Sequence, residues 1–145
     1  MKGCINRGFT GIIGFLLGIT LFALTSYAGK LLVIGGSDVP SLTKDDVKNI
    51  YLGFKRTFPD GTPVRIYVLK ESKLKEKFVR DVIGIQITEF RAHWLSKALA
   101  GEGGLPKELD ENGIIEAVRR ERGAVGFVPE GTPLPPGVKV LLEIE

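Results

Sequence analysis

The sequence predicts an α/β domain with a mixed sheet of about four strands, flanked by about four helices. Short apolar runs rich in β-branched residues alternate along the chain with segments whose apolar residues recur every three or four positions. Capping residues precede these helical segments and glycines follow them. Hydrophobic residues make up 43% of the 145 positions and charged residues 26%, as in ordinary globular domains, which argues against disorder and against a multi-span membrane protein.

The first part of this domain has the order strand, helix, strand. Residues 30–34 form an apolar run that ends in two glycines, which predicts a buried strand. Thr43 and Asp46 resemble a capping box at the start of a helix that ends at Gly53. Residues 64–69 alternate and carry β-branched and aromatic side chains, which predicts the second strand. This order favours a right-handed parallel crossover.

Three further helices and two strands are expected in the rest of the chain. Ser72 and Thr88 are the expected N-caps of the second and third helices, which end at Gly84 and Gly101. A fourth helix is expected at residues 112–121, and the last strands at residues 124–128 and 138–142. The apolar stripes of the four helices predict burial of Val47, Ile50, Phe78, Val82, Phe90, Trp94, Ile115 and Val118.

Residues 1–28 have the composition of a cleavable signal peptide. Two basic residues precede an uncharged run at residues 8–29, and Ser26 and Ala28 place small side chains two positions apart near its end. Cleavage after Ala28 leaves residues 29–145 as an exported α/β domain. A retained membrane anchor is the alternative, because the run reaches the roughly 20 residues that cross a bilayer as a helix.

Charge and cysteine content argue against a nucleic-acid-binding protein and against a lipoprotein. The formal net charge is +3, but no acidic residue precedes Asp38, so the chain beyond residue 28 is nearly neutral and offers no general basis for binding nucleic acid. Cys4 is the only cysteine and precedes the apolar run, so the domain is expected to have no disulfide. The cysteine of a lipoprotein signal follows the apolar run, so a lipid anchor on Cys4 is not expected.

No residue set predicts catalysis, a metal site or a cofactor. His93 is the only histidine and is expected on the surface of the third helix, so neither a zinc site nor a nucleophile-histidine pair can be assembled. Asp45 and Asp46 fall in the first turn of a helix, where the helix dipole favours acidic residues. The chain is therefore not expected to be an enzyme.

Ser72 is the strongest candidate for a ligand-binding residue. It begins a helix directly after the second strand, so its hydroxyl and the backbone N–H groups of the first turn converge as in anion sites. An ordinary N-cap is the alternative. Gly36 and Ser37, after the first strand, are candidate backbone and hydroxyl donors. Lys70, Lys73 and Lys75 add positive charge near Ser72, and Glu71 and Glu76 offset part of it.

Several segments resemble the phosphate-binding proteins of ABC importers. Residues 40–55 carry part of the likeness, and residues 122–128 are similar to a glycine-alanine-isoleucine-glycine-tyrosine segment of that family. Trp94 and residues 101–109 resemble a group of short exported proteins labelled phosphate ABC transporter substrate-binding proteins. The resemblance implies a single lobe of a type II periplasmic binding protein.

The resemblance also implies a function. Full-length members hold their ligand between two lobes, and this chain has room for one. In phosphate binders a serine-glycine-threonine sequence donates to the phosphate, whereas residues 70–75 here are Lys-Glu-Ser-Lys-Leu-Lys, so only Ser72 is carried over. The implied protein is a periplasmic module that binds phosphate or another oxyanion weakly and works with an ABC importer or an envelope sensor. The alternative is a lobe that has lost its ligand and binds another envelope protein. In either case, contact with the membrane is expected only through an uncleaved leader.

The leader generates a testable prediction. If signal peptidase cleaves after Ala28, the protein isolated from the cell envelope has an intact mass that corresponds to residues 29–145. A mature species that still carries residues 1–28 would show a retained anchor instead.

Overall fold

The computed structural model describes residues 30–70 and 72–145. The predicted leader, its cleavage after Ala28 and Cys4 lie outside the described residues. Among the helices of the described part, none combines the length and the apolar character needed to cross a membrane.

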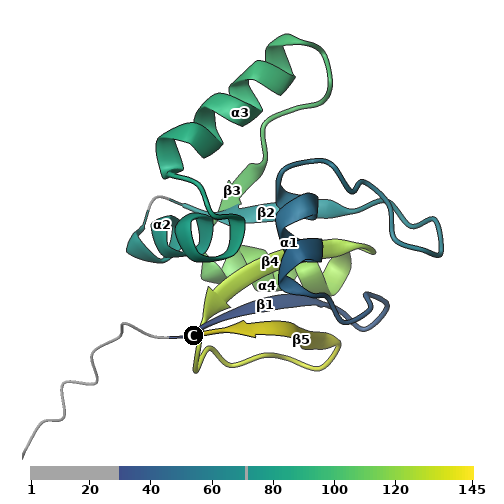
Figure 1. The fold of residues 1–145 in the computed structure, drawn as a ribbon. Helices are drawn as coiled ribbons and strands as arrows, with labels where there is room; N and C mark the ends of the chain where they lie inside the picture. The colour runs from purple at the N-terminus through teal and green to yellow at the C-terminus, as the bar shows by residue number, and fades with distance from the viewer. Residues whose placement is uncertain (1–29, 71) are drawn as a thin grey trace, which may run out of the picture.

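A mixed sheet of five strands forms the centre of the domain (Figure 1). The order across the sheet is β3-β2-β4-β1-β5. β1 is antiparallel to both of its neighbours, and β2 is parallel to both of its own. The predicted α/β class with a mixed sheet is confirmed. The strands are β1 (Leu31–Gly36), β2 (Arg65–Leu69), β3 (Lys107–Leu109), β4 (Ala124–Pro129) and β5 (Val138–Ile144).

One prediction about the sheet is wrong, and one strand was not predicted. β1 and β2 are not joined by a parallel crossover, because β4 lies between them and β1 runs in the opposite direction. The handedness rule applies to strands that are parallel, and an intervening helix does not by itself make two strands parallel. β3 was not expected, because its three residues, Lys-Glu-Leu, contain no apolar run; it is held by parallel pairing with β2.

The helices cover both faces of the sheet (Figure 1). α1, α2 and η1 lie on one face and α4 on the other, while α3 extends away from the sheet. η1 continues α2 with π-helical hydrogen bonds, such as Gly84 N–H to Val79 O at 2.9 Å. The helices are α1 (Lys44–Tyr51), α2 (Lys73–Phe78), η1 (Val79–Ile83), α3 (Ile87–Leu99) and α4 (Glu111–Arg120).

Most of the predicted caps are present. Thr43 and Asp46 form a reciprocal capping box, with both hydrogen bonds at 3.1 Å, and the Thr43 backbone N–H holds the pKa of Asp46 below its usual value. Ser72 caps α2 through its side chain. Thr88 is not a cap: α3 begins at Ile87 and its N-cap position is Gln86, which makes no side-chain capping bond.

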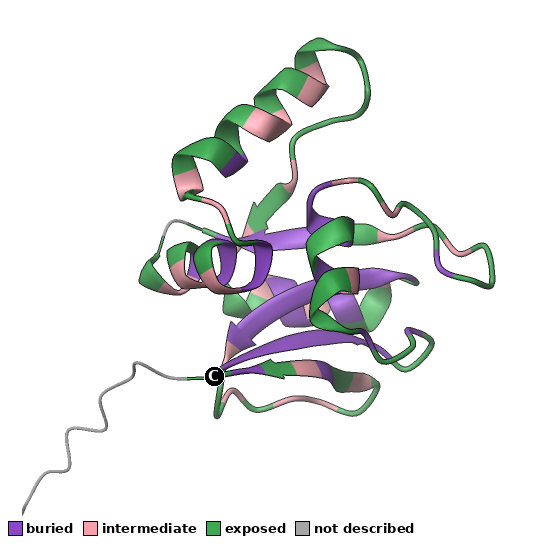
Figure 2. Cartoon of the chain, in the orientation of Figure 1, coloured by how far each residue is buried: buried purple, intermediate pink, exposed green. Residues whose placement is uncertain are grey.

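The predicted helix stripes are buried, with one exception. Every residue of the predicted set except Trp94 is buried. Trp94 is half-buried, and its indole N–H donates to the Tyr51 carbonyl at 3.0 Å. Along α3 only Phe90 is buried, which agrees with the largely exposed surface of this helix in Figure 2.

Three aromatic rings form the centre of the core between the sheet and α1. Phe78 and Phe127 stack with their centroids 3.9 Å apart, and the Tyr51 ring meets Phe78 edge-on at 4.7 Å. The buried Tyr51 hydroxyl contacts two strand carbonyls, Tyr67 O at 2.9 Å and Val125 O at 3.3 Å. Tyr51 therefore joins α1 to both β2 and β4.

On the other face, α4 packs closely against β4. A Cβ atom built on Gly126 would lie only 2.3 Å from the Cγ2 atom of Ile114. Only glycine permits this approach of the helix to the strand. Ile114, Ile115 and Val118 are buried in this layer, as the periodicity of the helix requires.

Removal of the Tyr51 hydroxyl should destabilise the domain. In Tyr51→Phe the two strand carbonyls lose their donor, which should lower the free energy of unfolding by about 1 to 3 kcal/mol at pH 7. Tyr67→Phe is the matched control. The Tyr67 hydroxyl donates to the partly exposed Glu121 carboxylate, which water can solvate when the hydroxyl is removed. The free energy of unfolding should therefore fall less in Tyr67→Phe than in Tyr51→Phe. Urea unfolding measures both; equal losses would contradict the proposed importance of the Tyr51 hydroxyl.

The same hydroxyl should make stability depend on alkaline pH. Complete burial raises the pKa of Tyr51 above its ordinary value of about 10. The folded protein therefore keeps a proton that the unfolded chain releases, so the stabilisation is present below about pH 10 and is lost as the pH rises further. Above this pH the free energy of unfolding should fall more steeply with pH for the wild type than for Tyr51→Phe. Equal slopes for the two proteins would contradict this role of the Tyr51 hydroxyl.

Candidate functional site

The carboxyl ends of β2, β3 and β4 meet at one edge of the sheet, because these strands are parallel. From β2 the chain crosses to β3, whereas from β4 it proceeds to β5 on the far side of β1. The connections thus diverge between β2 and β4. In open α/β sheets, ligands bind outside the carboxyl ends of the strands at such a switch point.

Ser72 lies at this edge, three residues after the end of β2. Its extended backbone starts α2, and its hydroxyl oxygen accepts a hydrogen bond from the Lys75 backbone N–H at 3.1 Å. The N-cap geometry is therefore present. A hydroxyl that accepts one hydrogen bond still carries a proton that it can donate to an anion. The side chain is exposed and accessible to a solute.

Two basic residues accompany Ser72. Lys70 and Lys73 are exposed, on either side of it in the sequence. The Lys70 backbone N–H donates to the Leu109 carbonyl at 3.0 Å, which ties this loop to the end of β3. The start of α2 thus combines a hydroxyl, helix-start N–H groups and positive charge, which is the chemistry that attracts an oxyanion.

Gly36 and Ser37 do not join Ser72. Gly35 and Ile66 both pair with Val125, so the end of β1 lies beside the start of β2. Ser72 follows the other end of β2. At about 3.3 Å per residue, the strand from Ile66 to Leu69 separates Gly36 and Ser37 from Ser72 by some 10 Å, which is more than one small anion can span.

The surroundings of Gly36 also disfavour an anion. A Cβ atom on Gly36 would lie 2.8 Å from a carboxylate oxygen of Asp38, so an acidic group faces this turn. The Asp38 carboxylate accepts from the Gly123 N–H at 3.3 Å and pairs with Arg122 at 3.8 Å. Ser72 and the two lysines close to it in the sequence therefore lie at one edge of the sheet, and Gly36 and Ser37 lie at the opposite edge.

The sequence reasoning missed a buried ion pair one turn after Ser72. Lys75 is only 2% exposed, and its ammonium lies 2.5 Å from the Glu108 carboxylate on β3. Lys75 does not add exposed positive charge beside Ser72 as the sequence predicts, because it lies three residues before Phe78 and seven before Val82, on the apolar stripe of the helix. That spacing is the signal that could have revealed its burial.

His93 is less exposed than expected. It is half-buried, and its Nε2 atom lies 2.7 Å from the Leu52 carbonyl. Because a carbonyl only accepts, this contact requires the proton on Nε2. Within residues 30–70 and 72–145, no group of three histidine, cysteine or acidic side chains is placed to hold a metal ion.

Three solved structures share this fold. An ABC-type phosphate transport receptor from Vibrio cholerae is 16% identical, with a TM-score of 0.54 over 78% of this chain. A phosphate ABC transporter substrate-binding protein from Clostridium perfringens, with bound phosphate, is 15% identical, with a TM-score of 0.59 over 78% of the chain. PstS from Borrelia burgdorferi is 12% identical, with a TM-score of 0.52 over 71%.

These similarities establish the fold. The chain spans 46%, 45% and 42% of the three proteins, less than half of each. The fold is that of a single lobe of a phosphate-binding-type protein, as the resemblance of the sequence implied. No protein-family model and no curated protein matches the chain.

The Lys75–Glu108 pair leads to a prediction about stability. Glu108→Ala should lower the free energy of unfolding by about 1 to 2 kcal/mol, less than for a fully buried pair because the carboxylate is half-exposed. Lys75→Met/Glu108→Leu should recover much of this loss, because an apolar pair needs no desolvated charge. A double variant less stable than Glu108→Ala would show that the pair stabilises the fold by itself.

Proposed function

We propose that this chain is an exported solute-binding module that binds an oxyanion such as phosphate at the Ser72 edge. The observation that carries the proposal is the position of Ser72, at the start of a helix and at the switch point of the sheet. Two of the solved structures with this fold are a phosphate transport receptor and a phosphate ABC transporter substrate-binding protein, which supports a role in binding rather than catalysis. Its partner in this proposal is an ABC importer or an envelope sensor.

Weak binding follows from the single lobe. One lobe contacts an anion from one side only, and water screens each charge-assisted hydrogen bond on the other side. We expect a dissociation constant on the order of millimolar unless a second subunit closes the site. A basic start, an apolar run and small residues before position 29 support export to the periplasm.

An interaction module with the same fold is the second candidate. Leu95 and Leu99 on α3 and Leu105 after it are 53%, 81% and 61% exposed. Apolar side chains that are so exposed on one extended helix favour contact with another protein of the envelope. This alternative predicts no anion binding at the Ser72 edge.

Calorimetry with phosphate and with sulfate tests the oxyanion site. The wild type should bind with a millimolar dissociation constant, and Ser72→Ala should weaken binding about three- to tenfold because one donor is lost. Thr43→Ala is the matched control: it removes the cap of α1, another N-cap with a side-chain hydroxyl, and should leave binding unchanged.

Further variants separate the two functions. Ser37→Ala should not change binding, because Ser37 lies at the opposite edge; an effect equal to that of Ser72→Ala would move the site. Micromolar binding by a monomer that is insensitive to Ser72→Ala would also move it. Complete absence of binding at millimolar phosphate, including in a dimer, would favour the interaction module.

A further inference from the structure

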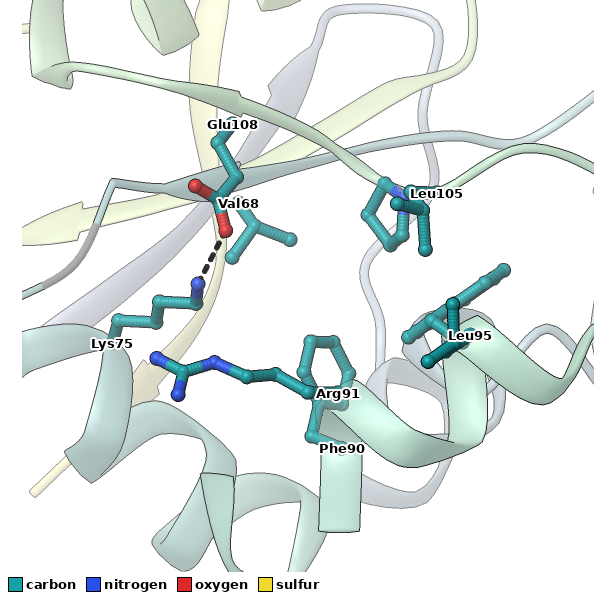
Figure 3. Close-up of a pocket in the computed structure, with 9 residues that line it drawn as sticks. Val68, Lys75, Phe90, Arg91, Leu95, Leu105 and Glu108 are labelled. Carbon is teal, nitrogen blue, oxygen red and sulfur yellow. Dashed lines mark hydrogen bonds and ion pairs between the residues drawn. The ribbon is translucent and has the colours of Figure 1, made fainter. Parts of the chain in front are cut away.

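A cavity of about 500 Å³ lies between α3 and the β2–β3 side of the sheet (Figure 3). This volume is within the range of about 300 to 1,000 Å³ that small-molecule sites occupy. Its walls come from β2, from α3 and from the loop before β3. Apolar side chains make up most of the lining: Val68, Phe90, Trp94, Leu95, Leu105 and Pro106.

Buried apolar residues form the floor of this cavity, and exposed apolar residues form its rim. Val68 on β2 and Phe90 on α3 are both buried. Leu95 on α3 and Leu105 before β3 also line the cavity, but each is more than half exposed. In Figure 3, Val68, Phe90 and Leu105 surround the open part of the cavity. An apolar molecule seated there would remove from water both its own surface and that of the two leucines.

The polar side chains of the lining are already engaged. The Trp94 indole N–H donates to the Tyr51 carbonyl at 3.0 Å, so its ring offers the cavity an apolar surface. The Lys75 ammonium lies 2.5 Å from the Glu108 carboxylate, and Arg91 takes part in an interaction of its own. In the part of the chain that the structure describes, no buried side-chain nitrogen or oxygen lacks a hydrogen-bond partner. The lining therefore does not depend on a ligand to pair a buried polar atom.

We propose that this cavity binds an uncharged, largely apolar small molecule. The apolar walls stabilise such a ligand because they remove its surface from water. A charged group that enters the cavity loses its hydration, and the charged side chains there are already engaged, so both anions and cations are disfavoured. Inorganic phosphate is disfavoured for the same reason. The inference is therefore independent of the proposed oxyanion site at Ser72.

An uncharged dye provides the binding assay. N-phenyl-1-naphthylamine fluoresces strongly only in apolar surroundings, and it should bind saturably to protein isolated from the cell envelope, with a dissociation constant on the order of 10 to 100 µM. Decanol should displace the dye. Decanoate and decylamine have the same chain with a negative or a positive charge, and each should displace the dye at least about tenfold more weakly, because a charge that enters the cavity loses its hydration. Phosphate should not displace it.

Variants at the rim localise the ligand. Leu95→Ser and Leu105→Ser should each weaken binding of the dye and of decanol about three- to tenfold, because each removes an apolar contact. Leu99→Ser is the matched control: Leu99 is more exposed than Leu95 on the same helix but does not line the cavity, so its replacement should leave binding unchanged. Circular dichroism melting shows whether each variant folds. Leu95 and Leu105 lie on different segments, so either variant supplies the test if the other does not fold.

Three outcomes would overturn the proposal. The first is the absence of saturable dye binding. The second is displacement of the dye by decanoate or decylamine at the same concentration as by decanol, which would show that the cavity accepts a charged group. The third is equal weakening by Leu95→Ser and Leu99→Ser, which would indicate non-specific adsorption to α3 or contact with a protein partner.

Discussion

The hydroxyl of Tyr51 holds together the two strands on which the proposed Ser72 site depends. The β2–β4 ladder has only two residue pairs, Arg65 with Ala124 and Ile66 with Val125. Beside this short ladder, the Tyr51 hydroxyl bridges the carbonyls of Tyr67 and Val125. Beyond this junction both strands continue to their carboxyl ends, the edge of the sheet at which Ser72 lies. A buried donor between two carbonyls is costly to remove, so this contact constrains the positions of both strands.

Tyr51 also positions Trp94, which lines a cavity between α3 and the β2–β3 side of the sheet. Its backbone carbonyl accepts the indole N–H of Trp94, which fixes α3 to the end of α1. Phe90 is the only buried residue of α3, and the partly exposed Ile87 and Trp94 also pack against the core. The half-buried His93 contributes a second contact, to the Leu52 carbonyl. Polar contacts to the end of α1, rather than a continuous apolar stripe, therefore hold this helix over the cavity.

The first turn of α2 connects the edge of the sheet with the cavity. Ser72 caps the helix by accepting from the Lys75 N–H, and the Lys75 side chain then extends to Glu108 on β3. A buried ammonium costs desolvation energy, which the carboxylate offsets in part. The same turn thus presents a hydroxyl to solvent and buries an ammonium group against β3.

The sequence alone determined the α/β class, four of the five strands and the capped starts of α1 and α2, because these depend on local periodicity and on side chains close in the chain. It also identified Ser72, whose role as a cap is local. Only the tertiary structure decided that β1 is antiparallel to β4, that Gly36 and Ser37 lie far from Ser72, and that Lys75 is buried against Glu108. Strand direction and the partners of a charged side chain are set by residues distant in the sequence: β3 exists only through its pairing with β2, and Lys75 is neutralised by a residue 33 positions away. The spacing along a helix can indicate that a residue such as Lys75 is buried, but it does not identify the distant residue that it contacts.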